Sequence, residues 1–463
     1  MTYISTRGRS PEIGFKDVLL SGLAPDGGLY MPTVWKNFDQ ADFTAIKSMP
    51  FDEVAAKVLG VFAGDDFSAS ELSALTEAAY KTFSTPDVAP MVQIGKEDFL
   101  LELFHGPTLA FKDVAMQILG QLYGYVLNES GRKKTIIGAT SGDTGGAAIE
   151  AFAGIEQVDV FMLHPEGRIS DVQRRIMTTV EANNIINIAV DGSFDDCQRI
   201  VKSLFADKAL NESHDLGGVN SINWVRLAAQ TVYYFTSARR IPGADYVVPT
   251  GNFGDIFAGY VAKKMGADIG KLAVAVNQNN IMDRVLKTGD YTPAQTVPTQ
   301  SPSMDIQVAS NFERLIFECE DRDGTVVSEM MTAFEQEKTL ALSSTLREKM
   351  SQDFVSAFAT EEAVSKKLAE IYRDHDMLID PHTAVGLVAN DILRREGQIA
   401  GPSITLATAH PAKFPDAVAA ATGKTPGLPE RYADLFERTE FMMKAANDVD
   451  AIARVIKNHN RNA

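Results

Sequence analysis

A lysine near the first quarter of the chain has the surroundings that amine chemistry needs. Lys112 follows the turn Gly106-Pro107, which ends a strand-like segment, and it stands where a helical pattern of apolar residues begins. The N-terminus of a helix carries roughly +0.5 of an elementary charge, which disfavours a protonated amine. A neutral lysine can attack a carbonyl and form a Schiff base. The pattern alone leaves two alternatives for Lys112, a reactive amine or a solvated surface lysine.

Two other turns have the composition of anion-binding sites, and each lies between a strand-like and a helix-like segment. The first turn comprises Ser141, Gly142, Asp143 and Thr144, and the second comprises Gly251, Asn252, Phe253, Gly254 and Asp255. Glycine lets the backbone approach a ligand closely, and free N–H groups at a helix start bind carboxylate or phosphate. Neither turn fits the phosphate-loop pattern of NTP-binding proteins or the Gly-x-Gly-x-x-Gly pattern of NAD-binding proteins. We expect both turns and Lys112 to meet in one crevice, beyond the ends of parallel strands.

The segments that position these residues alternate between strand and helix patterns. Strand-like segments lie at 99–103, 135–138, 158–163, 185–190, 246–249, 272–276 and 403–406, and helix-like segments begin at 70, 111, 145, 168, 193 and 221. Such alternation implies parallel strands that helices cover on both faces. The sequence therefore predicts an α/β fold.

The 463 residues are enough for two or three domains. We expect an N-terminal subdomain over residues 1–97 and a smaller α/β domain, carrying the lysine, over 98–240. A larger α/β domain over 241–463 would follow, with a mostly helical insertion at about 280–375 and α/β patterning resuming at 377–380.

Composition excludes several classes of function. The formal net charge of −17 disfavours a nucleic-acid partner, because phosphate backbones repel an acidic surface. No apolar run approaches the ~20 residues that cross a bilayer, and the start has no apolar signal segment. The two cysteines, Cys197 and Cys319, and the histidines show no metal-ligand spacing, so we expect no metal. These features together predict a cytoplasmic enzyme with a small-molecule substrate.

Several runs of residues resemble the threonine synthase family of fold-type II pyridoxal phosphate (PLP) enzymes, which have a tryptophan synthase β-like fold. The matching runs are 105–108 with 111–113, 140–145, 249–255 and 408–414, supported by 3–8, 25–30, 220–223 and 310–314. The resemblance spans nearly the whole chain and is closest to the branch shared by fungi and many bacteria. It implies a monomer that converts O-phospho-L-homoserine and water to L-threonine and phosphate.

The resemblance also implies roles for individual residues. Lys112 would hold the cofactor and later move protons, the turn 251–255 would hold the cofactor phosphate, and Thr408 would place its hydroxyl at the pyridine nitrogen. A neutral hydroxyl makes the ring a weaker electron sink than a carboxylate would, which favours elimination and replacement over transamination. The turn 141–144 would bind the substrate carboxylate. The candidates for the remaining substrate contacts are His105, Asn223, Arg226 and Lys413, with Arg7 and Arg9 as further cations.

Three alternatives remain open at this point. The chain could be another fold-type II PLP enzyme, either an amino-acid dehydratase or a β-replacing synthase. It could be a binding protein that kept the fold and lost catalysis, although Lys112 argues against that. It could also be a nucleotide-dependent α/β enzyme, which ATP or NAD would stabilise against heat.

Overall fold

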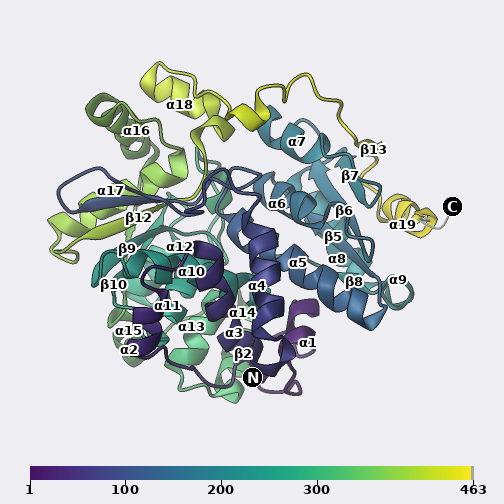
Figure 1. Cartoon of the computed structure of the whole chain (residues 1–463), viewed down its shortest axis with the longest axis horizontal. Helices are drawn as coiled ribbons and strands as arrows, with labels where there is room; N and C mark the ends of the chain where they lie inside the picture. Colours follow the sequence, from purple (N-terminus) through teal and green to yellow (C-terminus); the bar gives the residue numbers. More distant parts are fainter. Residues whose placement is uncertain (460–463) are drawn as a thin grey trace.

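Two sheets organise the computed structural model, which describes residues 1–459 (Figure 1). The larger sheet has the order β11 (Phe354–Phe358), β10 (Ile269–Val276), β9 (Ala244–Pro249), β12 (Ser403–Ala407), β4 (Asp98–Glu102) and β3 (Met91–Gln93). The smaller sheet has the order β13 (Met443–Ala445), β7 (Ile185–Val190), β6 (Val158–Pro165), β5 (Lys134–Ala139) and β8 (Leu216–Gly217). Neighbouring strands run parallel, except that β3 is antiparallel to β4. This confirms the predicted α/β fold.

The helices cover the sheets, and those of the N-terminal part pack on helices from the middle of the chain. The N-terminal part contains the hairpin strands β1 (Tyr3–Ser5) and β2 (Tyr30–Pro32) with α1 (Phe15–Leu20), α2 (Gln40–Ile46), α3 (Phe51–Ala63) and α4 (Ala69–Tyr80). The middle of the chain contains α5 (Lys112–Ser130), α6 (Asp143–Phe152), α7 (Asp171–Thr178), α8 (Phe194–Ala206), α9 (Lys208–His214), α10 (Trp224–Ala238), α11 (Gly254–Lys264) and α12 (Ile281–Thr288). The rest contains α13 (Phe312–Cys319), α14 (Gly324–Glu337), α15 (Ser344–Ser351), α16 (Glu361–His375), α17 (Pro381–Arg395), α18 (Pro415–Thr422) and α19 (Val449–Asn458).

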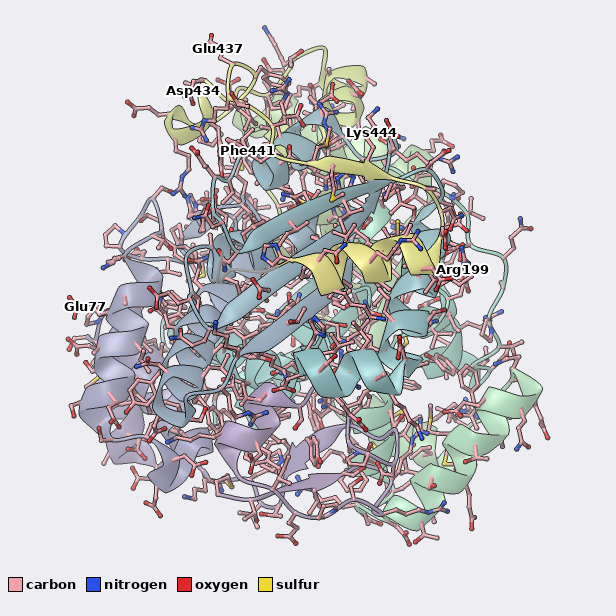
Figure 2. All side chains as sticks on the ribbon, turned by 90° about the vertical axis from the view of Figure 1, so that its right-hand side faces the viewer. Glu77, Arg199, Asp434, Glu437, Phe441 and Lys444 are labelled. Carbon is pink, nitrogen blue, oxygen red and sulfur yellow. The ribbon has the colours of Figure 1, made fainter. Side chains whose placement is uncertain are left out.

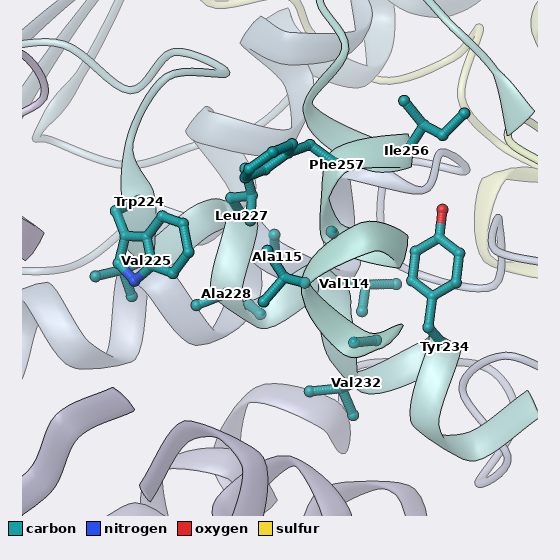
Figure 3. Packing of buried hydrophobic residues seen from close by; sticks show 14 of the residues in the cluster. Val114, Ala115, Trp224, Val225, Leu227, Ala228, Val232, Tyr234, Ile256 and Phe257 are labelled. Atoms are coloured by element: carbon teal, nitrogen blue, oxygen red, sulfur yellow. The ribbon is translucent and has the colours of Figure 1, made fainter. Parts of the chain in front are cut away.

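The core is built around α10. All residues of this helix are buried, because α3, α5 and α11 pack around it. Figure 3 shows Trp224, Leu227 and Val232 of α10 among side chains of α5 and α11. Helices α5 and α11, which begin at the lysine and at the second turn, therefore pack on a fully buried helix.

Local patterns predicted the elements well, with two differences. The helix predicted from residue 193 begins there as α8, and Ser193 and Asp196 form a capping box at its start. No strand forms at 377–380, because the Asp380 side chain accepts hydrogen bonds from the first N–H groups of α17 and so caps that helix. The insertion at 280–375 contains the edge strand β11 as well as helices.

The sheets also divide the chain differently from the expected domain boundaries. Strand β4 was expected in the smaller domain, but it pairs with β12 in the larger sheet. The end of the chain was expected in the larger domain, but β13 pairs with β7 of the smaller sheet, and α19 packs near α8 (Figure 2). The expected boundaries are wrong at these two places, because inter-strand hydrogen bonds decide sheet membership and sequence order does not. Within residues 1–459, no helix is long and apolar enough to cross a membrane.

Candidate active site

The site lies where strands of both sheets end. Lys112 is the first residue of α5 and Asp143 is the first residue of α6, which follows β5. Gly254 begins α11 after β9, and Thr408 directly follows β12. Ligands of α/β folds bind in the crevice at the carboxyl ends of the strands. The Nζ atom of Lys112 lies 3.2 Å from Oδ2 of Asp143, which confirms that the lysine and the first predicted turn converge.

The turn before Lys112 is held in place by its neighbour Asp113. The Asp113 carboxylate accepts hydrogen bonds from the backbone N–H (2.7 Å) and the hydroxyl (2.6 Å) of Thr108. A Cβ at Gly106 would lie 2.4 Å from the Cβ of Asp113, so only glycine fits there. Leu109 adopts a φ of 60°, a left-handed conformation that costs a non-glycine residue on the order of 1 kcal/mol. These contacts set the direction in which Lys112 enters the site.

The Thr408 segment is joined to the lysine turn through the backbone. The N–H of Phe111 donates to the carbonyl oxygen of Thr408 (2.8 Å). The N–H of His410 donates to the carbonyl oxygen of Leu109 (3.0 Å). Thr408 is buried. Two segments from distant parts of the sequence therefore lie side by side at the site.

Two lysines contact one buried carboxylate, and an arginine lies near one of these lysines. Asp143 contacts Lys112 through Oδ2, and its Oδ1 lies 2.6 Å from Nζ of Lys413. Arg226 is buried as well and lies within electrostatic range of Lys112. Arg226 forms no ion pair with a carboxylate among residues 1–459, so its positive charge has no direct counter-charge. Buried charge of this kind favours an anionic ligand.

The pKa of Lys112 is lowered, as the sequence predicted, but for a different main reason. Burial is the largest cause; Asp143 acts against it, while Lys413 and Arg226 lower the pKa further. The helix N-terminus had been the expected cause. For Asp143 the outcome is opposite: burial would raise its pKa, but Lys112 and Lys413 hold the pKa of the carboxyl well below its usual value.

Arg226 has a buried donor without a partner. Its Nη1 atom has no hydrogen-bond partner among residues 1–459, and burial lowers the pKa of the guanidinium to about 10. Asn223 caps the same helix, α10, and its amide oxygen accepts from the N–H groups of Val225 and Arg226. The Asn223 amide nitrogen donates to the carbonyl oxygen of Leu19. The structure therefore places Asn223 as the support of Arg226.

The turn before α11 has the geometry of a backbone anion site. Phe253 adopts a φ of 65°, and a Cβ at Gly251 would lie 2.8 Å from the carbonyl oxygen of Ser303. A Cβ at Gly254 would lie 3.2 Å from Nδ2 of Asn311. The first N–H groups of a helix have no partner within the helix and can bind phosphate.

The Asp255 side chain points toward two tyrosines instead. Its Oδ1 accepts hydrogen bonds from the hydroxyls of Tyr233 (2.5 Å) and Tyr234 (3.0 Å). Burial raises the pKa of Asp255 to about 6, although both hydroxyls lower it. A carboxylate repels phosphate, so Asp255 can contribute to an anion site through its backbone only.

The turn 141–144 is also shaped for backbone contacts. Gly142 adopts a φ of 131°, which requires glycine. The hydroxyl of Thr140 accepts hydrogen bonds from the N–H groups of Gly142 (2.9 Å) and Gly145 (2.8 Å). Ser141 is exposed and Thr144 is half-buried, so their polar groups can reach a ligand.

Among the other candidate cations, His105 and Arg7 have carboxylate partners elsewhere. His105 lies 2.8 Å from a Glu102 carboxylate oxygen, at the rim of the site. Arg7 forms ion pairs with Glu313 (3.2 Å) and Glu335 (3.0 Å), which hold the N-terminal segment against α13 and α14. Arg9 is exposed. Within residues 1–459, no cluster of His, Cys, Asp and Glu is arranged to hold a metal ion.

Sequence reasoning missed two residues that contact the Asp143 carboxylate. The amide of Gln173 donates to Oδ1 (2.8 Å), and the hydroxyl of Ser303 donates to Oδ2 (3.3 Å). Both lie outside the recognisable turns, on α7 and on a 3₁₀ turn at Pro302–Met304. No local signal marks them, because only the fold brings them to Asp143.

The residues present fit PLP. A lysine with a lowered pKa suits a carbonyl cofactor, the turn 251–255 suits its phosphate, and the unpaired donor of Arg226 suits an anion. Thr408, joined to the lysine turn, adds a hydroxyl to the same region.

Comparisons with known proteins agree over almost the whole chain. Family models match three consecutive parts: "Threonine synthase N terminus" at residues 2–80, "Pyridoxal-phosphate dependent enzyme" at 93–346 and "Threonine synthase, C-terminal" at 383–456. The threonine synthase of Pseudomonas aeruginosa is 44% identical over 99% of this chain and 98% of its own length. That of Saccharomyces cerevisiae is 41% identical over 90% of this chain and 88% of its own length.

Solved structures give the same result. The PLP-bound threonine synthase of Brucella melitensis superposes with a TM-score of 0.97 at 44% identity, and each chain is covered completely. The yeast enzyme superposes with a TM-score of 0.94 at 38% identity, covering 99% of this chain and 98% of its own. The chain therefore belongs to the threonine synthase family of pyridoxal-phosphate-dependent enzymes.

Proposed function

We propose that this chain converts O-phospho-L-homoserine and water to L-threonine and phosphate. The observation that carries the proposal is the cluster of three buried basic side chains, Lys112, Lys413 and the unpaired Arg226, in a chain whose net charge is −17. The substrate carries a carboxylate and a phosphate, and the cofactor carries another phosphate. A site with spare cations and free backbone N–H groups suits such ligands.

The cofactor contacts follow from the three segments that meet at the site. Lys112 would bind PLP through its amine, whose lowered pKa leaves a larger neutral fraction for the reaction. The backbone of residues 251–255 would hold the phosphate. Thr408 would offer its hydroxyl to the pyridine nitrogen, as a neutral partner.

The substrate contacts are divided between two kinds of donor. The backbone and hydroxyls of residues 141–144 would bind the carboxylate. Arg226 and Lys413 would bind the phosphate, with His105 at the rim and Asn223 holding Arg226 in place. The Asp143 carboxylate has a separate task, which is to orient the amines of Lys112 and Lys413.

The reaction balances with one water. PLP, when bound, supplies an electron sink that makes the Cα and Cβ protons of the substrate acidic. The Lys112 amine would remove the Cα proton, because it is held in the site and its pKa is lowered. A proton then leaves Cβ, and the γ-phosphate departs with the electron pair of the Cγ–O bond. A proton is added at Cγ, and water adds its hydroxyl at Cβ while its other proton passes to the released phosphate. Arg226 and Lys413 would stabilise the leaving phosphate, and Lys112 would return a proton to Cα.

We also propose the domain division given above, corrected for β4 and for the segment from β13 to α19, and a monomeric, cytoplasmic protein. Size-exclusion chromatography with light scattering tests the monomer. A mass of two or more chains would contradict it.

Two measurements test the function. Phosphate release from O-phospho-L-homoserine should far exceed ammonia release from serine or threonine; the reverse would favour a dehydratase. The PLP-loaded wild type should show a visible absorbance that borohydride abolishes. The Lys112→Ala variant should fold but lack this absorbance. A Lys112→Ala variant with full activity would refute the assignment.

A further inference from the structure

A buried histidine outside the predicted site lies next to the missed residue Ser303. His382 is the second residue of α17 and is 3% exposed. Its Nδ1 lies 2.6 Å from Oδ2 of Asp380, which is fully buried. A carboxylate is an acceptor, so Nδ1 carries a proton and donates to it, while Nε2 faces a backbone N–H and is therefore an acceptor.

The acceptor Nε2 has a specific partner. The backbone N–H of Ser303 donates to it at 3.3 Å. Capping of α17 explains Asp380, whose carboxylate also accepts from the N–H groups of His382 and Thr383. Capping does not require an imidazole at position 382, because that cap uses only the backbone N–H of this residue.

Ser303 joins three parts of the site. Its hydroxyl donates to Oδ2 of Asp143 (3.3 Å), the same oxygen that contacts Lys112. A Cβ added to Gly251 would lie 2.8 Å from the carbonyl oxygen of Ser303. Ser303 therefore packs directly on the turn 251–255, which is proposed to hold phosphate. A shift of Ser303 would therefore move the Asp143 carboxylate and the Gly251 backbone together.

We propose that His382 is a positioning residue for the reaction: oriented by Asp380, it holds Ser303, and Ser303 places the Asp143 carboxylate that orients the amine of Lys112. The inference rests on the proposed role of Lys112. It predicts that His382 acts on the reacting amine without touching substrate or cofactor. Misplacement of a catalytic group by about 1 Å can cost on the order of 100-fold in rate. Loss of the contacts from His382 through Ser303 and Asp143 should therefore lower the reaction rate measurably.

The experiment compares His382→Leu, Ser303→Ala and the double variant with the wild type. A matched control is His459→Leu, which removes another carboxylate-paired histidine, 3.1 Å from Asp159 and on the far side of the smaller sheet from α6. The first readout is the rate at which cofactor-free protein takes up PLP, followed by visible absorbance. The second is kcat and KM for O-phospho-L-homoserine.

Both single variants should lower the PLP uptake rate and kcat by roughly 10-fold or more, with a much smaller change in KM. The double variant should be no slower than the slower single variant, because both substitutions break the same path. Effects that multiply in the double variant would overturn the inference. His459→Leu should behave as the wild type does, and an equal loss there would assign the effect to general stability and overturn the inference too.

Ser303→Ala lets the test be decided even if the His382→Leu variant misfolds. It keeps the backbone N–H that donates to His382 and removes only the hydroxyl, so normal uptake and normal kcat in this variant would overturn the inference even if His382→Leu fails to fold. The proposed function can fail separately. Absence of phosphate release in the wild type would refute the function, while the PLP uptake rates would still decide the positioning role.

Discussion

Replacing Asp143 with asparagine should destabilise the cofactor-free protein strongly. The carboxylate contacts Lys112 at 3.2 Å and Lys413 at 2.6 Å, and all three side chains are buried. At 3.2 Å and an effective dielectric constant of about 20, one such pair is worth about 5 kcal/mol before the cost of desolvation. Removal of one partner from a buried pair typically costs 3–5 kcal/mol, because the other charge stays buried. We expect a loss of about that size for Asp143→Asn.

The assay is urea unfolding of the cofactor-free protein, with and without inorganic phosphate. The variant leaves Lys112 and Lys413 without the carboxylate that pairs with both, so phosphate should raise its unfolding midpoint more than that of the wild type. A ligand at 100 times its Kd adds about 2.7 kcal/mol of stability. The control is Asp434→Asn, which breaks an exposed ion pair with Arg438 and should change the midpoint little.

Two results would refute this reasoning. One is an Asp143→Asn variant as stable as the wild type without phosphate. The other is a phosphate effect of equal size in both proteins, which would mean that the cations are not left in excess.

Three further predictions concern other parts of the site. Thr408→Asp should increase the fraction of PLP converted to its amine form during turnover, measured by absorbance, because a carboxylate strengthens the electron sink; unchanged product ratios would contradict the role of a neutral partner. The pKa of Asp255 is raised from its ordinary value near 3.8 to about 6, so the stability from its neutral form is present near pH 4 and is lost as the pH rises through about 6. An asparagine does not ionise, so Asp255→Asn cannot lose this stability. Its free energy of unfolding relative to that of the wild type should therefore increase between pH 4 and pH 7 in urea unfolding; a pH-independent difference would argue against the raised pKa. Glu440→Ala should speed limited proteolysis of residues 424–442, because Glu440 accepts hydrogen bonds from Arg174 (2.9 Å) and Thr178 (2.8 Å) and so holds this segment on α7; an unchanged cleavage rate would show that other contacts suffice.

The C-terminal segment illustrates what local patterns leave open. Figure 2 shows it, with Asp434, Glu437 and Phe441 labelled, passing to the edge of the smaller sheet. The N–H of Phe441 donates to the carbonyl oxygen of Thr178. Its residues have no strong periodicity, so the sequence did not indicate that they return to the smaller sheet.

The sequence by itself determined the alternating elements, the turn glycines and the chemistry of the three site segments. These properties are local: a strand-to-helix turn with a φ of 131° at Gly142 needs glycine, and a lysine at a helix start after such a turn is visible in the chain. The resemblance to threonine synthases rested on these local runs.

Only the tertiary structure decided which charged groups form ion pairs and which side chains hold one another in place through hydrogen bonds. The pairing of Asp143 with Lys413 and the contact of His382 with Ser303 join residues far apart in the chain. The lowered pKa of Lys112 likewise comes mainly from burial, which depends on the packing of every surrounding element. Desolvation and long-range hydrogen bonds act through space, so no local pattern of residues encodes them.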